Sequence, residues 1–215
     1  SLAGYAAISA SIVAFFWSMF EALRWTSAVN AGAIHSLVPG LSALWAAALV
    51  RERIPLYQWV ALGFGIVGTV CVVFEGDPNR LLAIDLGRGD LVFFAGCVAM
   101  GLYTPFVRLF HRGEPAPVMS FWVLVTGCFW LILINNAGIW RHDWMAVPGE
   151  VYAGIAYLAV FTTLLTFLIQ QHATLRIGPT RVATYTYLTP ALVVLVDWIS
   201  GAPLPSGAVL VGIGI

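Results

Sequence analysis

Eight long apolar runs dominate this chain of 215 residues. An α-helix needs about 20 apolar residues to cross the hydrocarbon core of a bilayer, and most of the runs have about that length. Inside lipid, every backbone N–H and C=O group must find a partner within the chain, which a helix provides. The sequence therefore predicts a bundle of membrane-spanning helices. The runs cover residues 2–23, 28–50, 56–74, 90–108, 117–134, 151–170, 181–199 and a last one from about 204.

The composition excludes several classes of protein. Hydrophobic residues make up 60% of the chain and charged residues only 9%, whereas an ordinary soluble domain is about 25% charged. Ten basic and ten acidic residues cancel, so a nucleic-acid partner is not expected. Cys71, Cys97 and Cys128 fall singly in separate apolar runs, without metal-ligand spacing. Because phosphate-loop and hydrolase motifs are also absent, we expect no enzyme, no metal and no cofactor.

One pattern occurs twice, 151 residues apart. Each copy places a proline inside an apolar helix, Pro39 in the first and Pro190 in the second, with small polar residues just before it. A proline removes a backbone donor and interrupts the helix. Repeated broken helices in a membrane protein are typical of transporters built from two related halves.

The spacing of the two copies also predicts their relative direction. Equivalent helices are five spans apart, an odd number, so they cross the membrane in opposite directions. We therefore expect an all-α membrane protein, a polytopic transmembrane helix bundle of two inverted five-helix repeats, with about eight helices present. Alternate loops hold six arginines on one side and four on the other, a small bias that favours the first side as cytoplasmic.

Two regions carry a resemblance to a known family. Residues 22–68, ALRWTSAVNAGAIHSLVPGLSALWAAALVRERIPLYQWVALGFGIVG, resemble the EamA domain of the drug/metabolite transporter (DMT) superfamily. The matching features are the helix around Pro39, Glu52 at its end and the glycine-rich helix that follows. A second copy is similar, with Gly89-Asp90 at the start of one run and Pro190 in a later one.

The resemblance implies a division of the chain. Residues 1–76 correspond to helices three to five, a partial first repeat that lacks the first two of the family's ten helices. Residues 77–88 are a connecting loop, and residues 89–215 form the second repeat, helices six to ten with the last one truncated. Where the family has an acid after the ninth helix, this sequence has Ala202. Glu52 is therefore interpreted as a residue of an interface or helix end.

The resemblance also implies a function. The expected protein is a secondary transporter in the bacterial inner membrane, a multi-pass permease that exports a small metabolite, an amino acid or a drug-like compound by alternating access. Its partners are the lipid bilayer and the substrate, with protons as a candidate coupling ion. The sequence leaves open whether a homodimer forms. The alternative is a non-transporting membrane subunit, or a membrane-embedded enzyme on the same helical scaffold.

His35 is the sharpest candidate for a functional residue. Polar groups inside a bilayer are costly, so each one is a functional candidate. His35 stands four residues before Pro39, which leaves the His35 carbonyl without its helical donor. The repeat pairs His35 with Thr186 and Ser36 with Tyr187, and we expect these pairs to face a shared cavity. The alternative is a purely structural role, in which His35 forms a hydrogen bond to a neighbouring helix.

The other candidates are polar or aromatic residues within the runs. Thr184 and Tyr187 share a helix face and rank first, although a threonine can simply bond to its own helix. Glu21 is expected to form a local ion pair with Arg24. The candidate cavity residues are His35, Asn30, Ser36, Tyr103, Gln170, Thr184, Thr186, Tyr187 and Trp17. Pro39 and Pro190 are the expected helix breaks, and the expected helix-end acids are Glu21, Glu52 and Asp197.

Overall fold

The computed structural model describes residues 1–74, 77, 79, 87–141, 143–201 and 207–214. Throughout these residues the regular structure is helical, as expected from the apolar runs. Six helical segments are long and apolar enough to cross a membrane, namely Leu2–Ala22, Asn30–Leu49, Leu56–Val73, Arg88–Phe110, Ala116–Asn135 and Gly149–Ile177. Together with the interrupted helix over residues 179–199 and the short one that ends the chain, they account for all eight runs.

The first four spans are straight or broken once. They comprise α1 (Leu2–Ala22), α2 (Ala28–His35) with α3 (Val38–Leu49), α4 (Leu56–Val73), and α6 (Arg88–Gly101) with α7 (Tyr103–Phe110). Side chains cap two helix starts, where backbone donors lack partners. Ser27 Oγ accepts from the N–H of Asn30 at 3.1 Å, and Asp90 Oδ2 accepts from the N–H of Gly87 at 2.7 Å. Asp90 also accepts from the hydroxyl of Thr26, which ties the start of α6 to the end of α1.

The second half continues with longer and less regular spans. They comprise α8 (Ala116–Arg141), the 3₁₀ turn η1 (Trp144–Ala146), then α9 (Gly149–Tyr157), the π-helix η2 (Leu158–Leu165) and α10 (Thr166–Ile177). The chain ends with α11 (Pro179–Thr184), the 3₁₀ turn η3 (Tyr185–Leu188), α12 (Thr189–Ile199) and α13 (Gly207–Gly214). The apolar run expected to end at residue 170 therefore continues as helix to Ile177.

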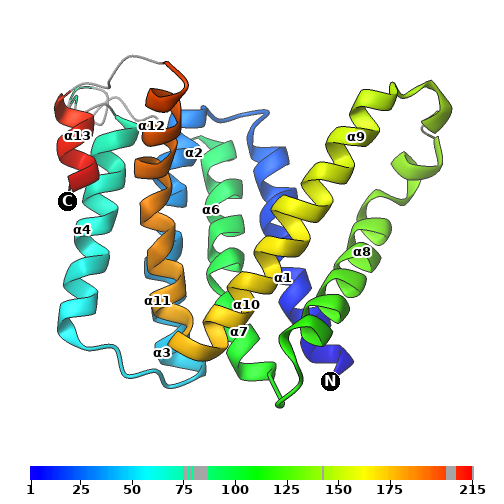
Figure 1. Ribbon diagram of the computed structural model, residues 1–215, viewed down its shortest axis with the longest axis horizontal. Helices are drawn as coiled ribbons and strands as arrows, with labels where there is room; N and C mark the ends of the chain where they lie inside the picture. The colour runs from blue at the N-terminus through cyan, green and yellow to red at the C-terminus, as the bar shows by residue number, and fades with distance from the viewer. Residues whose placement is uncertain (75–76, 78, 80–86, 142, 202–206, 215) are drawn as a thin grey trace.

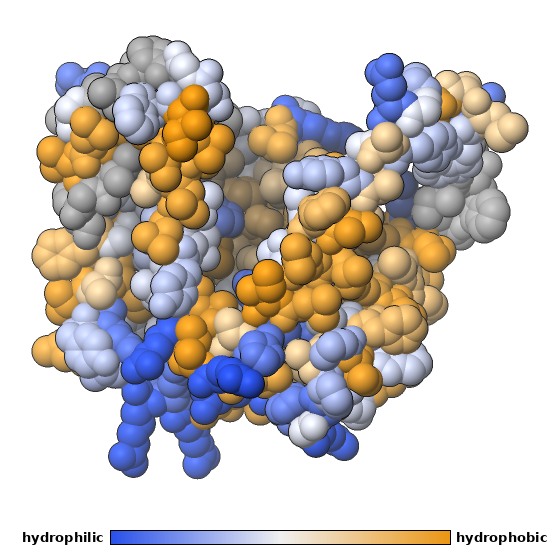
Figure 2. All heavy atoms as spheres, in the orientation of Figure 1, coloured by the Kyte–Doolittle hydropathy of each residue, from blue (hydrophilic) through white to orange (hydrophobic). Residues whose placement is uncertain are grey.

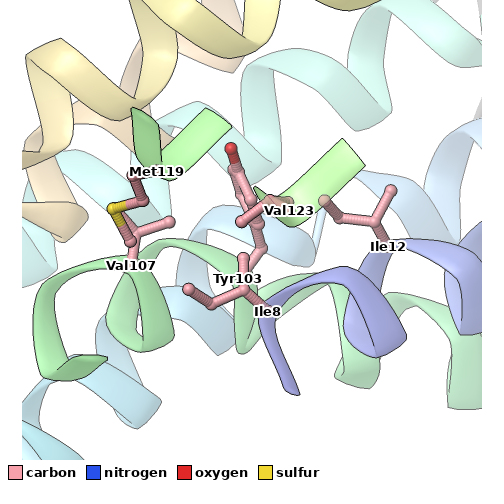
Figure 3. Packing of buried hydrophobic residues seen from close by; sticks show 6 residues of the cluster. All are labelled: Ile8, Ile12, Tyr103, Val107, Met119 and Val123. Atoms are coloured by element: carbon pink, nitrogen blue, oxygen red, sulfur yellow. The ribbon is translucent and has the colours of Figure 1, made fainter. Parts of the chain in front are cut away.

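Two buried clusters hold the spans together. In the first, six side chains of α1, α7 and α8 meet, as Figure 3 shows. The second joins α1, α3 and α6 around Phe15 and Phe93. Between helices, hydroxyls also pair directly, Ser9 with Thr126 at 2.9 Å and Ser42 with Thr104 at 2.7 Å. Such interhelical hydrogen bonds contribute to helix association in lipid, where the hydrophobic effect between helices is weak.

The arrangement in space matches the predicted inverted topology. In Figure 1, α2 and α3 descend behind α11 and α12, which ascend, so the two proline-containing copies run in opposite directions. The spans α4 and α11–α12 stand side by side, and α13 packs against α4 near the end of the chain. At the other edge, α8 packs against α1 and α10 packs against α7, whereas α9 leans away from the bundle. Figure 2 shows that the face between the α9–α10 column and the α11–α12 column is hollowed.

Candidate functional site

The two broken helices begin and resume at equivalent positions of the two repeats. The first begins at Ala28 and resumes at Val38, and the second begins at Pro179 and resumes at Thr189, each 151 residues further on. Pro39 and Pro190 both lie in the first turn of the resumed helix, α3 and α12, where the missing N–H of a proline costs little. The break that the sequence predicts is therefore present in both repeats. The side chain of Pro190 lies outside the described residues.

The two breaks touch each other through Tyr187. Its phenol donates a hydrogen bond to the carbonyl of Ser36 at 3.0 Å. Its ring lies against Gly65 of α4, so close that a Cβ at position 65 would be 2.4 Å from Cδ2 of the ring. The expected proximity of Ser36 and Tyr187 is therefore present. The Ser36 hydroxyl itself donates to the carbonyl of Ala33 at 2.6 Å, within its own helix.

A cavity of about 450 Å³ lies where α10 approaches the second broken helix. Its polar groups are an amide and four hydroxyls, and the rest of its wall is aliphatic. We call it the hydroxyl cavity; its polar lining is Thr166, Gln170, Tyr185, Thr186 and Thr189, and its apolar lining is Ile169, Ala173, Ile177 and Val182. None of these lining residues is charged. This lining suits a small ligand that donates and accepts hydrogen bonds and carries no net charge.

A second cavity, of about 490 Å³, lies on the other side of the same broken helix. We call it the α4 groove, because one face of α4 from Gln58 to Val72 forms one of its walls. The opposite wall comes from α11, η3 and α12, with Gly212 of α13 at one end. Its lining on α4 and α12 is mainly glycine, alanine and aliphatic side chains. Tyr185 lines both cavities.

The predicted cavity residues divide between these places. Gln170 and Thr186 line the hydroxyl cavity, whereas Thr184 and Tyr187 line the α4 groove. The hydroxyl of Thr184 donates to the carbonyl of Thr180 at 2.9 Å, so it is bound within its own helix.

Five further candidates line neither cavity, namely Ser36, whose contacts are given above, and the four that follow. The ring of His35 packs against Phe15, with the ring centroids 5.7 Å apart. Asn30 lies in the first turn of α2, where its N–H is capped by Ser27. Trp17 is 52% exposed on α1. Tyr103 is fully buried in the cluster of α1, α7 and α8, because its position on α7 turns the ring toward Ile8 and Met119 (Figure 3).

The helix-end acids form specific contacts. Glu21 and Arg24 approach to 3.5 Å, which confirms the expected local ion pair. Glu52 accepts a hydrogen bond at 3.0 Å from the hydroxyl of Thr180, at the start of α11. This contact joins the end of the first broken helix to the start of the second and fits the interpretation of Glu52 as an interface residue. The side chain of Asp197 lies outside the described residues.

Sequence reasoning missed several polar residues. Thr166 is four positions before Gln170, so helical spacing alone places both on one face. Gln171, its neighbour, is fully buried and accepts a hydrogen bond from Ser120 at 2.7 Å. Tyr185 and Thr189 are obvious in the sequence, but only the structure selects them from a run rich in threonine and tyrosine. Across the described residues, no three His, Cys, Asp or Glu side chains gather as metal ligands would.

Comparison with known proteins identifies the family. A model of the EamA-like transporter family matches residues 2–74 and 87–215. The uncharacterized transporter YyaM of Bacillus subtilis (strain 168) is 27% identical over 201 residues, which cover 91% of this chain and 66% of that protein. The uncharacterized transporter YdfC of the same organism is 21% identical over 189 residues, 86% of this chain and 59% of that protein. The chain thus spans about two-thirds or less of the length of these relatives.

The fold has a counterpart among solved structures. One crystal structure superposes with a TM-score of 0.79 at 21% identity and covers 98% of this chain and 71% of that one. This likeness bears on the fold alone. The family match extends over both repeats and includes all six candidate spans. The chain is a multi-pass membrane protein that belongs to the EamA-like transporter family.

Proposed function

We propose that the protein is a secondary transporter whose substrate, a small neutral or zwitterionic metabolite such as an amino acid, binds in the hydroxyl cavity. One observation carries the proposal. The cavity lies at the break of the second broken helix, where η3 replaces regular α-helix, and it faces α10 across the hollow side of the molecule (Figure 2). In secondary transporters, substrates bind near interrupted helices, whose freed backbone groups add hydrogen-bonding capacity.

The lining of the cavity supports this class of substrate. Three hydroxyls and the amide of Gln170 can donate and accept, so they match a ligand with both kinds of group. The hydroxyl of Thr166 donates to the carbonyl of Phe161 at 3.3 Å and can still accept. A permanent ion would lose hydration in lipid without a counter-charge among the lining residues, at a cost of several kcal/mol. A zwitterion or a neutral polar molecule avoids most of that cost, because its own charges or dipoles compensate each other. Tyr185 and Ile177 add apolar surface for the carbon skeleton.

The inverted repeat supports movement by alternating access. The two broken helices run in opposite directions and meet at the hydrogen bond between Tyr187 and Ser36. Rocking of one repeat against the other around this contact would expose the hydroxyl cavity first to one side and then to the other. Export from a bacterial inner membrane is the direction that the family resemblance favours.

Coupling to protons through His35 remains a separate proposal. An imidazole is the side chain whose ordinary pKa lies nearest neutrality, and His35 stands beside the first break. Substitution by glutamine keeps its size and hydrogen bonding but removes the titration. If a His35→Gln variant retains the pH dependence of uptake in proteoliposomes, this part of the proposal is withdrawn.

Ligand binding can be tested with a panel of compounds that does not presuppose one substrate. The purified protein is screened by thermal unfolding against amino acids and small neutral metabolites, because a ligand at 100 times its Kd adds about 2.7 kcal/mol of stability. For any ligand that raises Tm, Gln170→Ala and Thr186→Val are expected to raise Kd about threefold to tenfold each, the effect of one lost hydrogen bond.

Thr162→Val is the matched control for the screen. The Thr162 hydroxyl bonds at 2.6 Å to the carbonyl of Leu158 in its own helix, and it lines neither cavity. This variant is expected to bind as the unmodified protein does. A ligand whose affinity is equally insensitive to all three substitutions binds elsewhere and refutes the assignment of the site.

A further inference from the structure

The two broken helices meet at two levels along their length. Near the breaks, the phenol of Tyr187 donates to the carbonyl of Ser36 at 3.0 Å. Further along, the hydroxyl of Thr180 donates to the carboxylate of Glu52, also at 3.0 Å. Thr180 and Tyr187 are seven residues apart, about 10 Å along a helix. The second contact therefore lies away from the breaks, at the end of the bundle where α3, α7 and α10 finish, which we call the arginine-rich end (Figure 1).

The backbone holds Glu52 in this place. Its N–H donates to the carbonyl of Ala46 in α3 at 3.1 Å, so the residue is tied to the first broken helix. Arg51, directly before it, has a φ of 52°, a left-handed conformation that residues with a side chain rarely adopt. Such a conformation persists only where the surrounding contacts enforce it, and it is found preferentially at functional sites and switch regions. The strained turn therefore points to a functional role for the residue that follows it.

Groups from three other elements surround the Glu52 carboxylate. A Cβ at Gly178, between α10 and α11, would lie 2.9 Å from Oε1 of Glu52 and 3.2 Å from Nη1 of Arg108 in the last turn of α7. The carboxylate and the guanidinium therefore converge on one point, from which a side chain at position 178 would displace them. Thr180, 1% exposed at the start of α11, binds the other carboxylate oxygen. This bond and the attraction between the two charges hold the end of α3 against α11 and α7.

The sequence does not repeat this contact in the second half. The offset of 151 residues pairs Glu52 with Pro203 and Thr180 with Val29. Neither a proline nor a valine side chain can donate or accept a hydrogen bond. Pro203 lies outside the described residues, so the comparison is one of sequence alone. In a transporter whose two halves exchange roles, a contact present at only one end favours one of the two states.

We propose that Glu52, Thr180 and Arg108 form a latch that closes the arginine-rich end of the two broken helices. On the transport function proposed above, the repeats rock about the contact between Tyr187 and Ser36, so the ends of α3 and α11 separate when this end opens. Opening then breaks the bond between Glu52 and Thr180. Because the latch is one-sided, the protein without ligand rests with the arginine-rich end closed. Substrate opens it by binding the open state more tightly.

The accessibility of a buried thiol measures the latch without any substrate. In a background without the native cysteines, Ala183→Cys places a thiol about one helical turn beyond Thr180, where the native side chain is 6% exposed. A membrane-impermeant reagent reaches this thiol only while the helix ends are apart. When closing is faster than labelling, the labelling rate is proportional to the open fraction. Arg53→Cys, exposed beside Glu52, identifies the membrane preparation that presents this end to the reagent.

Loss of the latch should raise the labelling rate at position 183. We expect a rise of about tenfold to a hundredfold in Glu52→Ala, the effect of losing a hydrogen bond to a charged group. Thr180→Val should raise the rate about tenfold, whereas Thr180→Ser keeps the hydroxyl and should leave the rate unchanged. Arg108→Gln should raise it about threefold, because the attraction of one exposed charge is lost.

Ser9→Ala is the matched control for a lost interhelical hydrogen bond. The Ser9 hydroxyl is 2.9 Å from that of Thr126, between α1 and α8 and away from the latch. This variant should lower the thermal stability but label at the unmodified rate. Ala46→Cys, at a fully buried position of α3, is the second reporter in case Ala183→Cys does not fold.

An unchanged labelling rate in Glu52→Ala would overturn the latch. So would an equal rise in Ser9→Ala, which would show general loosening, or a rise in Thr180→Ser, which would show an effect of packing. These outcomes are distinct from those of the ligand screen. If Gln170→Ala and Thr186→Val weaken binding but the latch variants label at the unmodified rate, the substrate site stands and the latch fails. If the latch variants label faster and no ligand raises Tm, the latch stands and the substrate site fails.

Discussion

Substitution of Gly65 tests the packing between the first repeat and the second broken helix. An ideal Cβ at this position would lie 2.4 Å from Cδ2 and 2.5 Å from Cε2 of Tyr187, whereas carbon atoms pack at about 3.5–4.0 Å. In Gly65→Ala the ring must therefore move by about 1 Å. Overpacking of this kind costs about 1–3 kcal/mol. Movement of the ring also breaks the 3.0 Å bond to Ser36, which adds about 0.5–1.5 kcal/mol.

Gly63→Ala is the matched control on the same helix. A Cβ at position 63 would have nothing within 4 Å. This change only improves helix propensity, by up to about 1 kcal/mol. We expect the free energy of unfolding of the two variants, measured by denaturant titration in detergent micelles, to differ by about 2–4 kcal/mol. In a Tyr187→Ala background the clash is absent, so Gly65→Ala should then cost no more than Gly63→Ala.

Equal stability of the two single variants would refute this packing. So would an undiminished difference in the Tyr187→Ala background, because the cost would then come from something other than the tyrosine ring.

Two further predictions concern the ends of the helices. Thr180→Val removes the hydrogen bond to Glu52 and should lower the free energy of unfolding by about 1–2 kcal/mol, whereas Thr162→Val should change it little; equal effects of the two would contradict the contact. Glu114 lies in the loop before α8, where burial raises the pKa of its carboxyl. Hydrogen bonds from backbone N–H groups and from the phenol of Tyr5, together with the charge of His111, lower this pKa by more than burial raises it, so the net pKa lies below normal. A depressed pKa stabilises the fold above the unfolded value of about 4.3, and this contribution is lost as the pH falls through the folded pKa. Thermal unfolding at a series of pH values should therefore show Glu114→Gln less stable than the unmodified protein at pH 7, with a difference that disappears in acid; a constant difference would refute the ionic origin.

The broken helices could be predicted from the sequence because proline acts locally. Pro39 and Pro190 each interrupt the helix wherever tertiary contacts place it, and an offset of 151 residues aligns both breaks. The same offset predicted that Ser36 and Tyr187 would meet. Hydropathy also located the spans, since lipid demands apolar length.

The predicted end of the sixth span, near residue 170, was wrong for a physical reason. Gln170, Gln171 and Thr174 lower the local hydropathy, which indicated an end near residue 170. The helix continues because Gln171 finds Ser120 as a partner on α8 and Thr174 bonds to the carbonyl of Gln170. Hydropathy does not register such partners, because they come from the packing of other helices.

The candidate site was harder to predict from the sequence, because the side chains that line a cavity depend on how each helix is rotated about its axis. Helical spacing places Thr184 and Tyr187 on one face and Thr186 on another, and the structure agrees, because Thr184 and Tyr187 line the α4 groove and Thr186 lines the hydroxyl cavity. Spacing alone does not say which of these faces borders a cavity. Tyr103 carries a hydroxyl that suggests a cavity, but its neighbours on α1 and α8 enclose it.

The central claim is that water and substrate reach the hydroxyl cavity from one side of the membrane. Single cysteines at Gln170, Thr186 and Val67 are compared in a background without Cys71, Cys97 and Cys128, using a membrane-impermeant thiol reagent on protein in lipid. Val67 is 52% exposed, lies midway along α4 and lines neither cavity. The account predicts rapid labelling at positions 170 and 186, with protection by a bound ligand, and no labelling at position 67. Absence of labelling at positions 170 and 186 would contradict it.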